Sequence, residues 1–283
     1  MYPSGPARPG AGCAIGYGAG MRVVPVPCLS DNYAYLVVDD DGVAAVVDPG
    51  EAPPVLAAVA REGARLAAVW ATHHHPDHVG GTRALREALP DLEVVAHASD
   101  RARVPEVTRD VEDAQTIELG RLRARIVHNP GHTLGAISYV VRDEDGHERA
   151  IFTGDTLFAA GCGRIFEGTP AMMASSLGRL AAEAPALEVY FGHEYTVSNL
   201  RFASAVSPDD AAVADRAREA AARRAAGEPT TPSTIGLERA TNPFLRASEP
   251  AIAAAAHAHD ASVREDDAVA VFAALRRWKD GFR

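Results

Sequence analysis

Four histidines and one aspartate crowd into the segment Thr72–His78, which reads Thr-His-His-His-Pro-Asp-His. Imidazole nitrogens and carboxylate oxygens bind divalent transition metals. The chain has 11 histidines in 283 residues, so composition alone does not predict such a cluster. Side chains two positions apart share a side only in extended chain. His73 and His75 can therefore face one ion while Asp77 and His78 turn towards a second.

Three more potential ligands each follow a predicted strand. His132 stands in Asn-Pro-Gly-His-Thr, Asp155 in Phe-Thr-Gly-Asp-Thr, and His193 in Tyr-Phe-Gly-His-Glu. A single such residue is more often a cap or a turn residue. Side chains at the same ends of neighbouring strands converge in an α/β scaffold, however. We therefore expect these three to join the histidine run and complete a site for two metal ions.

The elements that must position these side chains are strands interleaved with a few helices between Met21 and about Gly192. So many strands with so few helices favour two sheets with helices outside over one doubly wound sheet. β-Branched and apolar runs predict strands at Arg22–Leu29, Tyr33–Val38, Val43–Asp48, Leu66–Thr72, Glu93–His97, Arg123–His128, Ala136–Arg142, Ala150–Thr153 and Leu187–Gly192. Helices are predicted at Pro53–Glu62, Gly81–Leu89 and Pro170–Ala184, the last with Thr169 as its N-cap.

Beyond His193 the pattern becomes helical. A helix is predicted to open at Ser207–Asp210 and to close at Arg223, Arg224 and Gly227. A turn-rich connector, Pro229–Leu245, precedes two further predicted helices, Ser248–Asp260 and Asp266–Trp278. We expect a flexible glycine- and proline-rich tail (residues 1–20), a catalytic domain (21–200) and a mainly helical substrate-binding subdomain (201–283), with the boundary near 195–206.

Composition excludes several classes of protein. The net charge of −10 argues against a nucleic-acid partner, which would require a basic face. No apolar run approaches the roughly 18 residues that span a membrane. Cys13, Cys28 and Cys162 are odd in number and far apart, so they form no disulfide framework. The cysteines favour a reducing cytoplasm; we further expect a monomer or a weak oligomer that binds a small-molecule substrate and neither nucleic acid nor a membrane.

The sequence resembles the metallo-β-lactamase superfamily and, within it, glyoxalase II, the hydroxyacylglutathione hydrolases. The resemblance covers most of the chain from Met21 onward. The motifs at Thr72–His78, Gly131–Thr133 and Thr153–Asp155 mark the superfamily. The motifs that narrow it to glyoxalase II are Gly161–Arg164 with Glu167–Gly168, Gly192–Thr196, Asn242–Arg246 and Arg276–Lys279.

The resemblance implies an αββα sandwich with a C-terminal helical subdomain. It implies that His73, His75 and His132 hold one metal, that Asp77, His78 and His193 hold the other, and that Asp155 bridges both. Asp77 and Asp155 would be the catalytic residues, with His74 facing away. The reaction implied is hydrolysis of S-lactoylglutathione to glutathione and D-lactate by a hydroxide bound to two divalent ions, which are zinc, iron or manganese.

The resemblance also points to residues that bind the thiol carrier: Arg164, Tyr195, Arg276 and Lys279. Two positions depart from the family pattern. Phe166 stands where many relatives carry a tyrosine that contacts glutathione, and Ala136 replaces a frequent histidine. A thioester of a different cellular thiol therefore remains an alternative. Cys162 has no histidine partner in the sequence, so we interpret it as a packed loop cysteine rather than a nucleophile.

Other activities on the same scaffold remain open, namely β-lactam hydrolysis, persulfide dioxygenation and nuclease activity. The acidic balance argues against a nuclease, and the C-terminal motifs argue against the other two. A non-catalytic metal-binding scaffold is a further alternative. Structural zinc sites are usually closed and rich in cysteine, however, whereas no cysteine joins this cluster.

Overall fold

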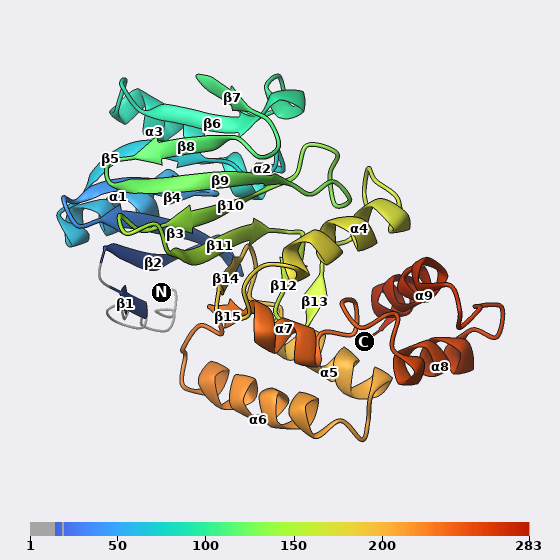
Figure 1. Ribbon diagram of the computed structural model, residues 1–283. Helices are drawn as coiled ribbons and strands as arrows, with labels where there is room; N and C mark the ends of the chain where they lie inside the picture. The colour runs from blue at the N-terminus through green and yellow to red at the C-terminus, as the bar shows by residue number, and fades with distance from the viewer. Residues whose placement is uncertain (1–14, 19, 283) are drawn as a thin grey trace, which may run out of the picture.

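A seven-stranded β-sheet forms one half of the central sandwich (Figure 1). The computed structural model describes residues 15–18 and 20–282. Strands β1 to β4 are antiparallel neighbours, and β4 to β7 are parallel neighbours. The strands are β1 (Ile15–Gly18), β2 (Met21–Cys28), β3 (Asn32–Asp39), β4 (Val43–Val47), β5 (Arg65–Trp70), β6 (Glu93–His97) and β7 (Arg109–Val111).

A six-stranded sheet with the order β15-β14-β11-β10-β9-β8 forms the other half. Its strands are antiparallel neighbours except β11 and β14, which are parallel. They are β8 (Thr116–Leu119), β9 (Leu122–His128), β10 (Ile137–Arg142), β11 (Glu148–Gly154), β14 (Glu188–Phe191) and β15 (Ser233–Thr234). A small hairpin joins β12 (Leu157–Phe158) to β13 (Gly161–Cys162).

The period-two alternation of side chains explains how one strand serves two cores. In β3, Tyr35 and Val37 point into the layer between the two sheets, where Trp70 stacks on Tyr139 with ring centroids 5.2 Å apart. Leu36 and its alternate neighbours point to the other face and pack under helices. All of β3 is buried, which is why it reads as a nearly continuous apolar run.

Helices cover the outer faces of both sheets. Over the first sheet lie α1 (Ala52–Glu62), α2 (Pro76–Val79) and α3 (Thr82–Ala88), and a 3-10 turn, η1 (Ala98–Asp100), follows β6. The remaining helices lie on the side of the second sheet (Figure 1). They are α4 (Pro170–Ala181), α5 (Thr196–Val206), α6 (Ala211–Ala225), α7 (Ile235–Thr241), α8 (Pro250–His259) and α9 (Ala268–Gly281).

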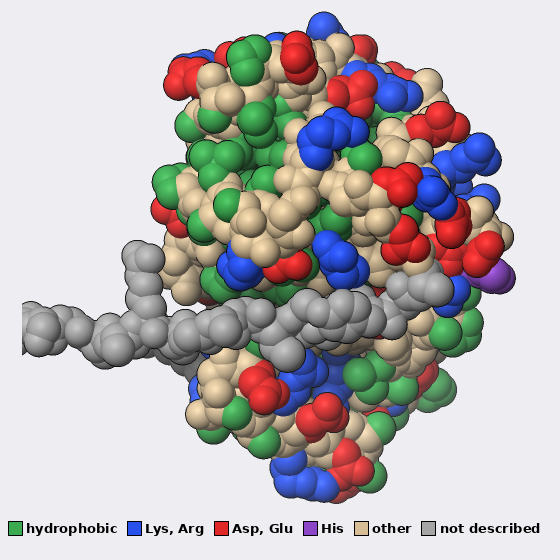
Figure 2. Space-filling view, turned by 90° about the vertical axis from the view of Figure 1, so that its left-hand side faces the viewer, with side chains coloured by type: hydrophobic (Ala, Val, Ile, Leu, Met, Phe, Trp, Pro, Cys, Tyr) green, Lys and Arg blue, Asp and Glu red, His purple; other side chains and the backbone are tan. Residues whose placement is uncertain are grey.

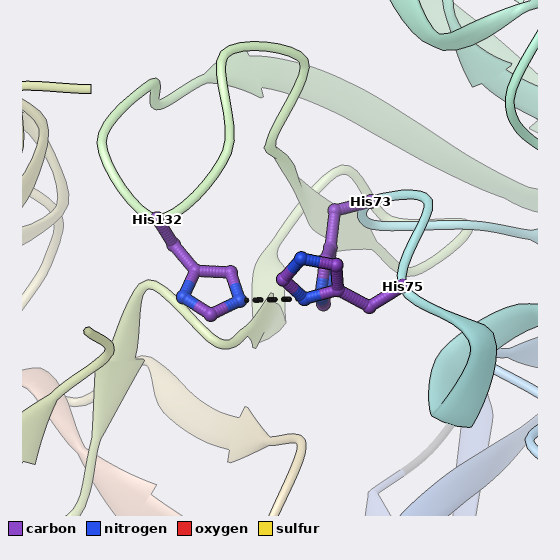
Figure 3. A group of neighbouring side chains, drawn as sticks. All are labelled: His73, His75 and His132. Atoms are coloured by element: carbon purple, nitrogen blue, oxygen red, sulfur yellow. Dashed lines mark hydrogen bonds between the residues drawn. The ribbon is translucent and has the colours of Figure 1, made fainter. Parts of the chain in front are cut away.

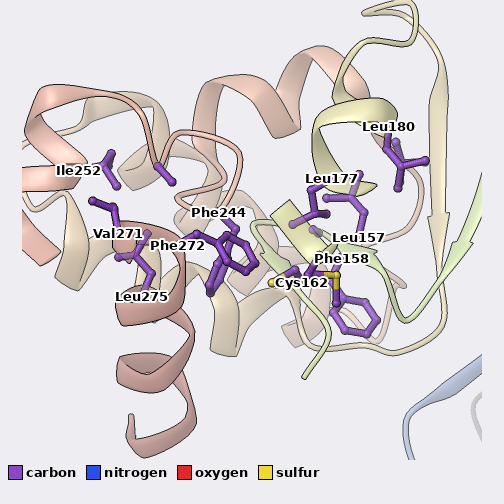
Figure 4. Close-up of a cluster of buried hydrophobic side chains, with 14 of the residues drawn as sticks. Leu157, Phe158, Cys162, Leu177, Leu180, Phe244, Ile252, Val271, Phe272 and Leu275 are labelled. Carbon is purple, nitrogen blue, oxygen red and sulfur yellow. The ribbon is translucent and has the colours of Figure 1, made fainter. Parts of the chain in front are cut away.

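One apolar cluster joins these C-terminal helices to the sheet domain (Figure 4). Phe272 of α9 contacts Phe244, with ring centroids 5.7 Å apart, and Leu275, Leu177 and Leu157 belong to the same cluster. All five side chains are at most 3% exposed. Burial of this kind gives roughly 1.5–3 kcal/mol for each large side chain. The helical region is therefore anchored by a shared core.

The predicted fold class is confirmed: two sheets lie between layers of helices, and a helical region follows. Each predicted strand and helix is present, with ends that agree to within three residues. The Thr169 hydroxyl accepts from Met172 N at 3.2 Å, so the predicted N-cap of α4 is confirmed. The predictions missed the short strands β7, β8, β12, β13 and β15.

Three predicted boundaries differ from the structure. Residues 15–18 form β1, so the tail predicted for 1–20 is a strand in this part, and residues 1–14 and 19 lie outside the described residues. The break predicted between 200 and 201 falls inside helix α5. The predicted connector Pro229–Leu245 contains β15 and α7. Thr234 caps α7, and buried Glu238 pairs with Arg216, so long-range contacts fix this segment.

The described helices include none that is both long and apolar enough to cross a lipid bilayer. On the face shown in Figure 2, acidic and basic side chains are interspersed rather than separated into large patches.

Candidate metal centre

The ends of four strands position the predicted ligands. His73 and His75 follow β5, and His75 is extended (φ −61°, ψ 142°), as their shared direction requires. Pro76 then begins α2, which turns Asp77 and His78 away from that direction. The other three predicted ligands, His132, Asp155 and His193, follow β9, β11 and β14 respectively. The structure brings six of the seven into two groups of three and places Asp155 beside both.

The first group consists of His73, His75 and His132 (Figure 3). His75 Nδ1 lies 3.1 Å from His73 Nε2 and 3.0 Å from His132 Nε2. A tetrahedral zinc ion with Zn–N bonds of about 2.0–2.1 Å separates its nitrogen ligands by about 3.3 Å. The observed spacing therefore fits three nitrogens directed at a common cation.

The second group consists of Asp77, His78 and His193. His78 Nε2 lies 3.3 Å from His193 Nε2, and Asp77 Oδ2 lies 3.4 Å from His193 Nε2 and 3.6 Å from His78 Nε2. Asn32 Nδ2 donates to Asp77 Oδ2 at 3.0 Å and holds that carboxylate in place. This group thus offers two nitrogens and one oxygen to a second cation.

Asp155 lies between the two groups. Its Oδ2 is 3.5 Å from His132 Nε2 and 3.3 Å from His193 Nε2, and its Oδ1 is 3.3 Å from His78 Nε2. Oδ1 is buried and has no hydrogen-bond partner among the described residues. A buried carboxylate oxygen without a partner is costly unless a cation compensates it. The residues present therefore fit a pair of divalent ions.

The nitrogens of the first group are neutral near pH 7. Burial, reinforced by the neighbouring imidazoles, lowers the pKa of His75 to about 4. Burial also lowers the pKa of His73 and of His132. Deprotonated imidazole is the form that binds metals, so this group is ready to act as a ligand set.

The second group has the opposite electrostatic character. Burial lowers the pKa of His193, but hydrogen bonds to Asp155 and Asp77 outweigh it and raise this pKa to about 10. Burial likewise opposes the rise in the pKa of His78, which the charges of Asp155 and Asp48 bring about. The carboxylates here require positive charge, which either protons or a metal ion can supply.

Two aspartates that the sequence reasoning missed support this second group. Asp48 Oδ2 accepts from His78 Nδ1 at 2.9 Å, and Asp31 Oδ1 accepts from His193 Nδ1 at 2.9 Å. Both hydrogen bonds leave the Nε2 atoms directed at Asp155. A carboxylate behind a ligating histidine fixes its tautomer and orientation. Asp48 could have been identified from the sequence, because it lies at a strand end before Pro-Gly. No feature of the sequence marks Asp31.

A glycine beside the centre is required by space. A Cβ atom on Gly192 would lie 2.5 Å from Asp155 Oδ1 and 2.7 Å from His78 Cε1. Such contacts are far inside van der Waals distance, so any other residue there would displace Asp155 or His78. The glycine that precedes His193 in the motif is therefore part of the site.

Two exposed aromatic rings flank the centre. The Phe166 ring is 62% exposed and stands edge-on to His75 and His132, with centroids 5.5 and 5.3 Å apart. The Tyr195 ring stacks on His193 at 4.8 Å and is 38% exposed. Burial raises the pKa of Tyr195 to about 12, so its hydroxyl is a hydrogen-bond donor at neutral pH.

A cavity of about 540 Å³ opens beside Phe166. The exposed Arg164 lies in its wall, with Nε 3.7 Å from Asp280 Oδ1. Arg277 and Asp280 also line this cavity, and the sequence reasoning singled out neither. Arg277 lies within the motif Arg276–Lys279, so the motif itself could have identified it. Asp280 lies four residues after Arg276, so the helix period could have placed these two side chains on the same face.

The two C-terminal cations predicted to bind substrate are placed differently from each other. Arg276 is 7% exposed and donates to Cys162 O at 2.8 Å and to Asp280 at 3.0 Å. Its guanidinium therefore fastens α9 to the loop that bears Arg164. Lys279 donates to Ser198 Oγ at 3.2 Å.

The cysteine and histidines outside the predicted set have other contacts. Cys162 is buried in strand β13 rather than in a loop, and burial raises its pKa to about 11, which agrees with a packed cysteine that is not a nucleophile. His74 contacts none of the seven predicted ligands through a hydrogen bond; its partners are Asp100 and Arg103.

Comparison with known proteins first identifies the superfamily to which the fold belongs. The model of the metallo-beta-lactamase superfamily matches residues 30–214. Solved structures with the same fold include ETHE1 from Myxococcus xanthus (TM-score 0.60, 23% identity, 92% of this chain and 90% of that chain) and the BLEG-1 B3 metallo-beta-lactamase (TM-score 0.59, 21% identity, 80% and 99%).

Further matches define the family within this superfamily. The model of the hydroxyacylglutathione hydrolase C-terminus matches residues 194–282. A hydroxyacylglutathione hydrolase of Alkalilimnicola ehrlichii is 49% identical over 92% of this chain and 98% of its own length, and one of Xanthomonas campestris is 46% identical over 93% and 100%. The chain belongs to the hydroxyacylglutathione hydrolase family.

Proposed function

We propose that this protein hydrolyses S-lactoylglutathione to glutathione and D-lactate with the help of two divalent metal ions. The observation that carries the proposal is the convergence of two three-residue ligand groups on Asp155, whose Oδ1 is buried without a partner. The names of relatives 46–49% identical over almost their whole length support the substrate.

We propose that His73, His75 and His132 hold one ion, that Asp77, His78 and His193 hold the other, and that Asp155 bridges them. Zinc suits the nitrogen-rich donor set, and iron or manganese are also compatible with histidine and carboxylate ligands. TTHA1623, 28% identical and solved in a di-iron-bound form (TM-score 0.55, 78% of this chain and 99% of that chain), supports an occupancy of two.

When bound, such ions lower the pKa of water from about 15.7 towards 7 and polarise a carbonyl oxygen. Asp77 and Asp155 provide the negative charge at the reacting centre. Hydrogen bonding to His193 lowers the pKa of Asp77, so its carboxylate remains ionised and can accept a hydrogen bond from water at Oδ2. Asn32 orients that carboxylate through its hydrogen bond. In this mechanism Asp77 orients the nucleophile.

The side chains around the centre position the thioester. Phe166 and Tyr195 provide apolar walls on opposite sides of the ligand groups, and the Tyr195 hydroxyl remains a donor. The exposed Arg164 guanidinium, whose Nε lies 3.7 Å from Asp280 Oδ1, is placed to bind a carboxylate of the carrier peptide. Lys279 adds a second cation near the C-terminal helix. The departing thiolate is stable near neutrality, since a free thiol has a pKa of about 8.5, so no protein acid is required.

Phe166 keeps one alternative open. A phenylalanine at this position cannot donate a hydrogen bond to a carrier, and a thioester of a different cellular thiol would not need one. Location in a reducing cytoplasm remains a prediction; the free, buried cysteines Cys28 and Cys162 support it.

Purified protein assayed with thioesters on different thiol carriers, alongside its metal content, tests the proposal. We expect about two ions per chain and the fastest hydrolysis with S-lactoylglutathione. Faster hydrolysis of a thioester built on another thiol would show that glutathione is not the preferred carrier. Unchanged hydrolysis after complete removal of metal would contradict the proposed chemistry itself.

A further inference from the structure

We propose that His74 and Asp100 are positioning residues that hold the first metal group (His73, His75 and His132) in its ligating geometry. This inference rests on the proposed function, because it assumes that the group binds an ion. His74 lies between two predicted ligands in the sequence, yet its side chain turns away from them to Asp100 in η1.

The hydrogen-bond pattern fixes the orientation of the His74 ring. Arg103 donates from Nη2 to His74 Nε2. A guanidinium can only donate, so Nε2 is the acceptor and the ring proton resides on Nδ1. His74 Nδ1 therefore donates to Asp100 Oδ2, 3.1 Å away. An imidazole with both nitrogens engaged cannot rotate without losing both hydrogen bonds.

Asp100 also supports the loop that carries His132. The Asp100 side chain is 2% exposed, and Gly135 packs directly on it: a Cβ on Gly135 would lie 2.3 Å from Asp100 Cγ. Asp100 Oδ1 is buried without a hydrogen-bond partner among the described residues and lies 3.6 Å from Arg103 Nη1. The carboxylate thus contacts both loops that supply the first group.

A third loop closes the network. Arg103 Nη2 also donates to Glu167, and Glu167 Oε2 accepts from Leu134 N at 2.8 Å. Leu134 lies two residues after His132, and Glu167 adjoins Phe166. The loops that supply the first group and its aromatic wall are therefore joined through four polar side chains. The second group has its own supports, so we expect the network to act on the first group alone.

Zinc titration of metal-free protein, with imidazole ¹⁵N resonances showing which histidines each equivalent perturbs, tests this assignment. His74→Phe keeps the ring and removes both hydrogen bonds. We expect it to weaken zinc binding at His73, His75 and His132 about 10- to 100-fold, as for other supporting residues, with the second group unchanged. Asp100→Asn keeps an oxygen for His74 Nδ1 and should therefore retain most of the wild-type affinity.

Arg101→Gln is the matched control, because Arg101 lies on the same segment but pairs with the exposed Asp110. It should bind both ions as the wild type does. Unchanged binding by His74→Phe, or an equal loss at both groups, would overturn the positioning role while leaving the proposed function intact. A wild-type protein that binds no ion at His73, His75 and His132 would overturn both.

Discussion

Replacement of Asp48 by asparagine should weaken the second ligand group through the tautomer of one histidine. Asp48 is buried and accepts three hydrogen bonds, from Thr72 N at 2.7 Å, from Thr72 Oγ1 at 2.6 Å and from His78 Nδ1 at 2.9 Å. Its φ of 49° lies in the left-handed region. Asparagine tolerates that conformation, so the variant changes hydrogen bonding and charge without straining the backbone.

Asparagine offers one acceptor and one donor where Asp48 offers two acceptors. If its amide nitrogen faces His78, then Nδ1 must accept and the ring proton moves to Nε2, the atom that faces His193. If the amide flips, its nitrogen opposes Thr72 N instead. We expect metal affinity of the second group to fall about 10- to 100-fold, equivalent to roughly 1.4–2.8 kcal/mol. The flipped amide would cost a comparable 1–3 kcal/mol or so in folding stability.

Zinc titration against a competing chelator measures the change in metal affinity. Denaturation of the metal-free protein measures the change in folding stability. Asp143→Asn is the control: Asp143 is equally buried and accepts from His147 N and Arg149, but it lies in the β10–β11 hairpin. The control should bind two ions as the wild type does. If Asp48→Asn also binds both with wild-type affinity, the reasoning about the His78 tautomer is wrong.

Three further predictions concern the carrier, the pH and the metals. Arg164→Gln should raise KM for S-lactoylglutathione about tenfold, roughly 1.4 kcal/mol for one charge-assisted hydrogen bond, with kcat unchanged in steady-state kinetics; a loss confined to kcat would contradict a binding role. The hydrogen bond from Arg103 lowers the pKa of Glu167 to about 2, from 4.5, so its stabilising effect is complete above pH 4.5 and is lost as the pH falls towards 2. The stability difference between wild type and Glu167→Gln, measured by urea denaturation, should therefore shrink below pH 4.5, and a difference that grows there would contradict the ion pair. Free zinc at a hundred times its Kd should stabilise the protein by about 2.7 kcal/mol per site, which calorimetry would detect as a higher Tm; an unchanged Tm would exclude binding to the folded state.

The sequence indicated which candidate ligands lie close together because five of the seven follow shortly after a strand and the other two lie in the short helix after β5. The period-two argument placed His73 and His75 together, and the helix-starting Pro76 turned Asp77 and His78 aside, as the structure shows. Long apolar runs such as β3 were predictable for the same reason: they are buried on both faces and carry an unambiguous pattern.

What the sequence could not give depends on contacts between distant residues. Asp31 lies far along the chain from His193, and nothing local marks it as a hydrogen-bond partner. Helix α7 lies in a segment rich in turn-forming residues and is fixed by the buried pair of Glu238 with Arg216. The motif around Arg276 was visible, but its burial against Cys162 was not. Local pattern carries no information about such pairings.

The edge strand β15 has a consequence for the modularity of this enzyme. It pairs with β14 in the sheet, although it belongs by sequence to the helical half, and Ile235 of the following helix packs in the same core as Phe191. A chimera that borrows the helices but omits residues 230–241 would leave β14 with an open backbone edge, and unpaired edges of this kind promote self-association. A chimera that transfers the helical region to another protein of this fold should therefore include strand β15.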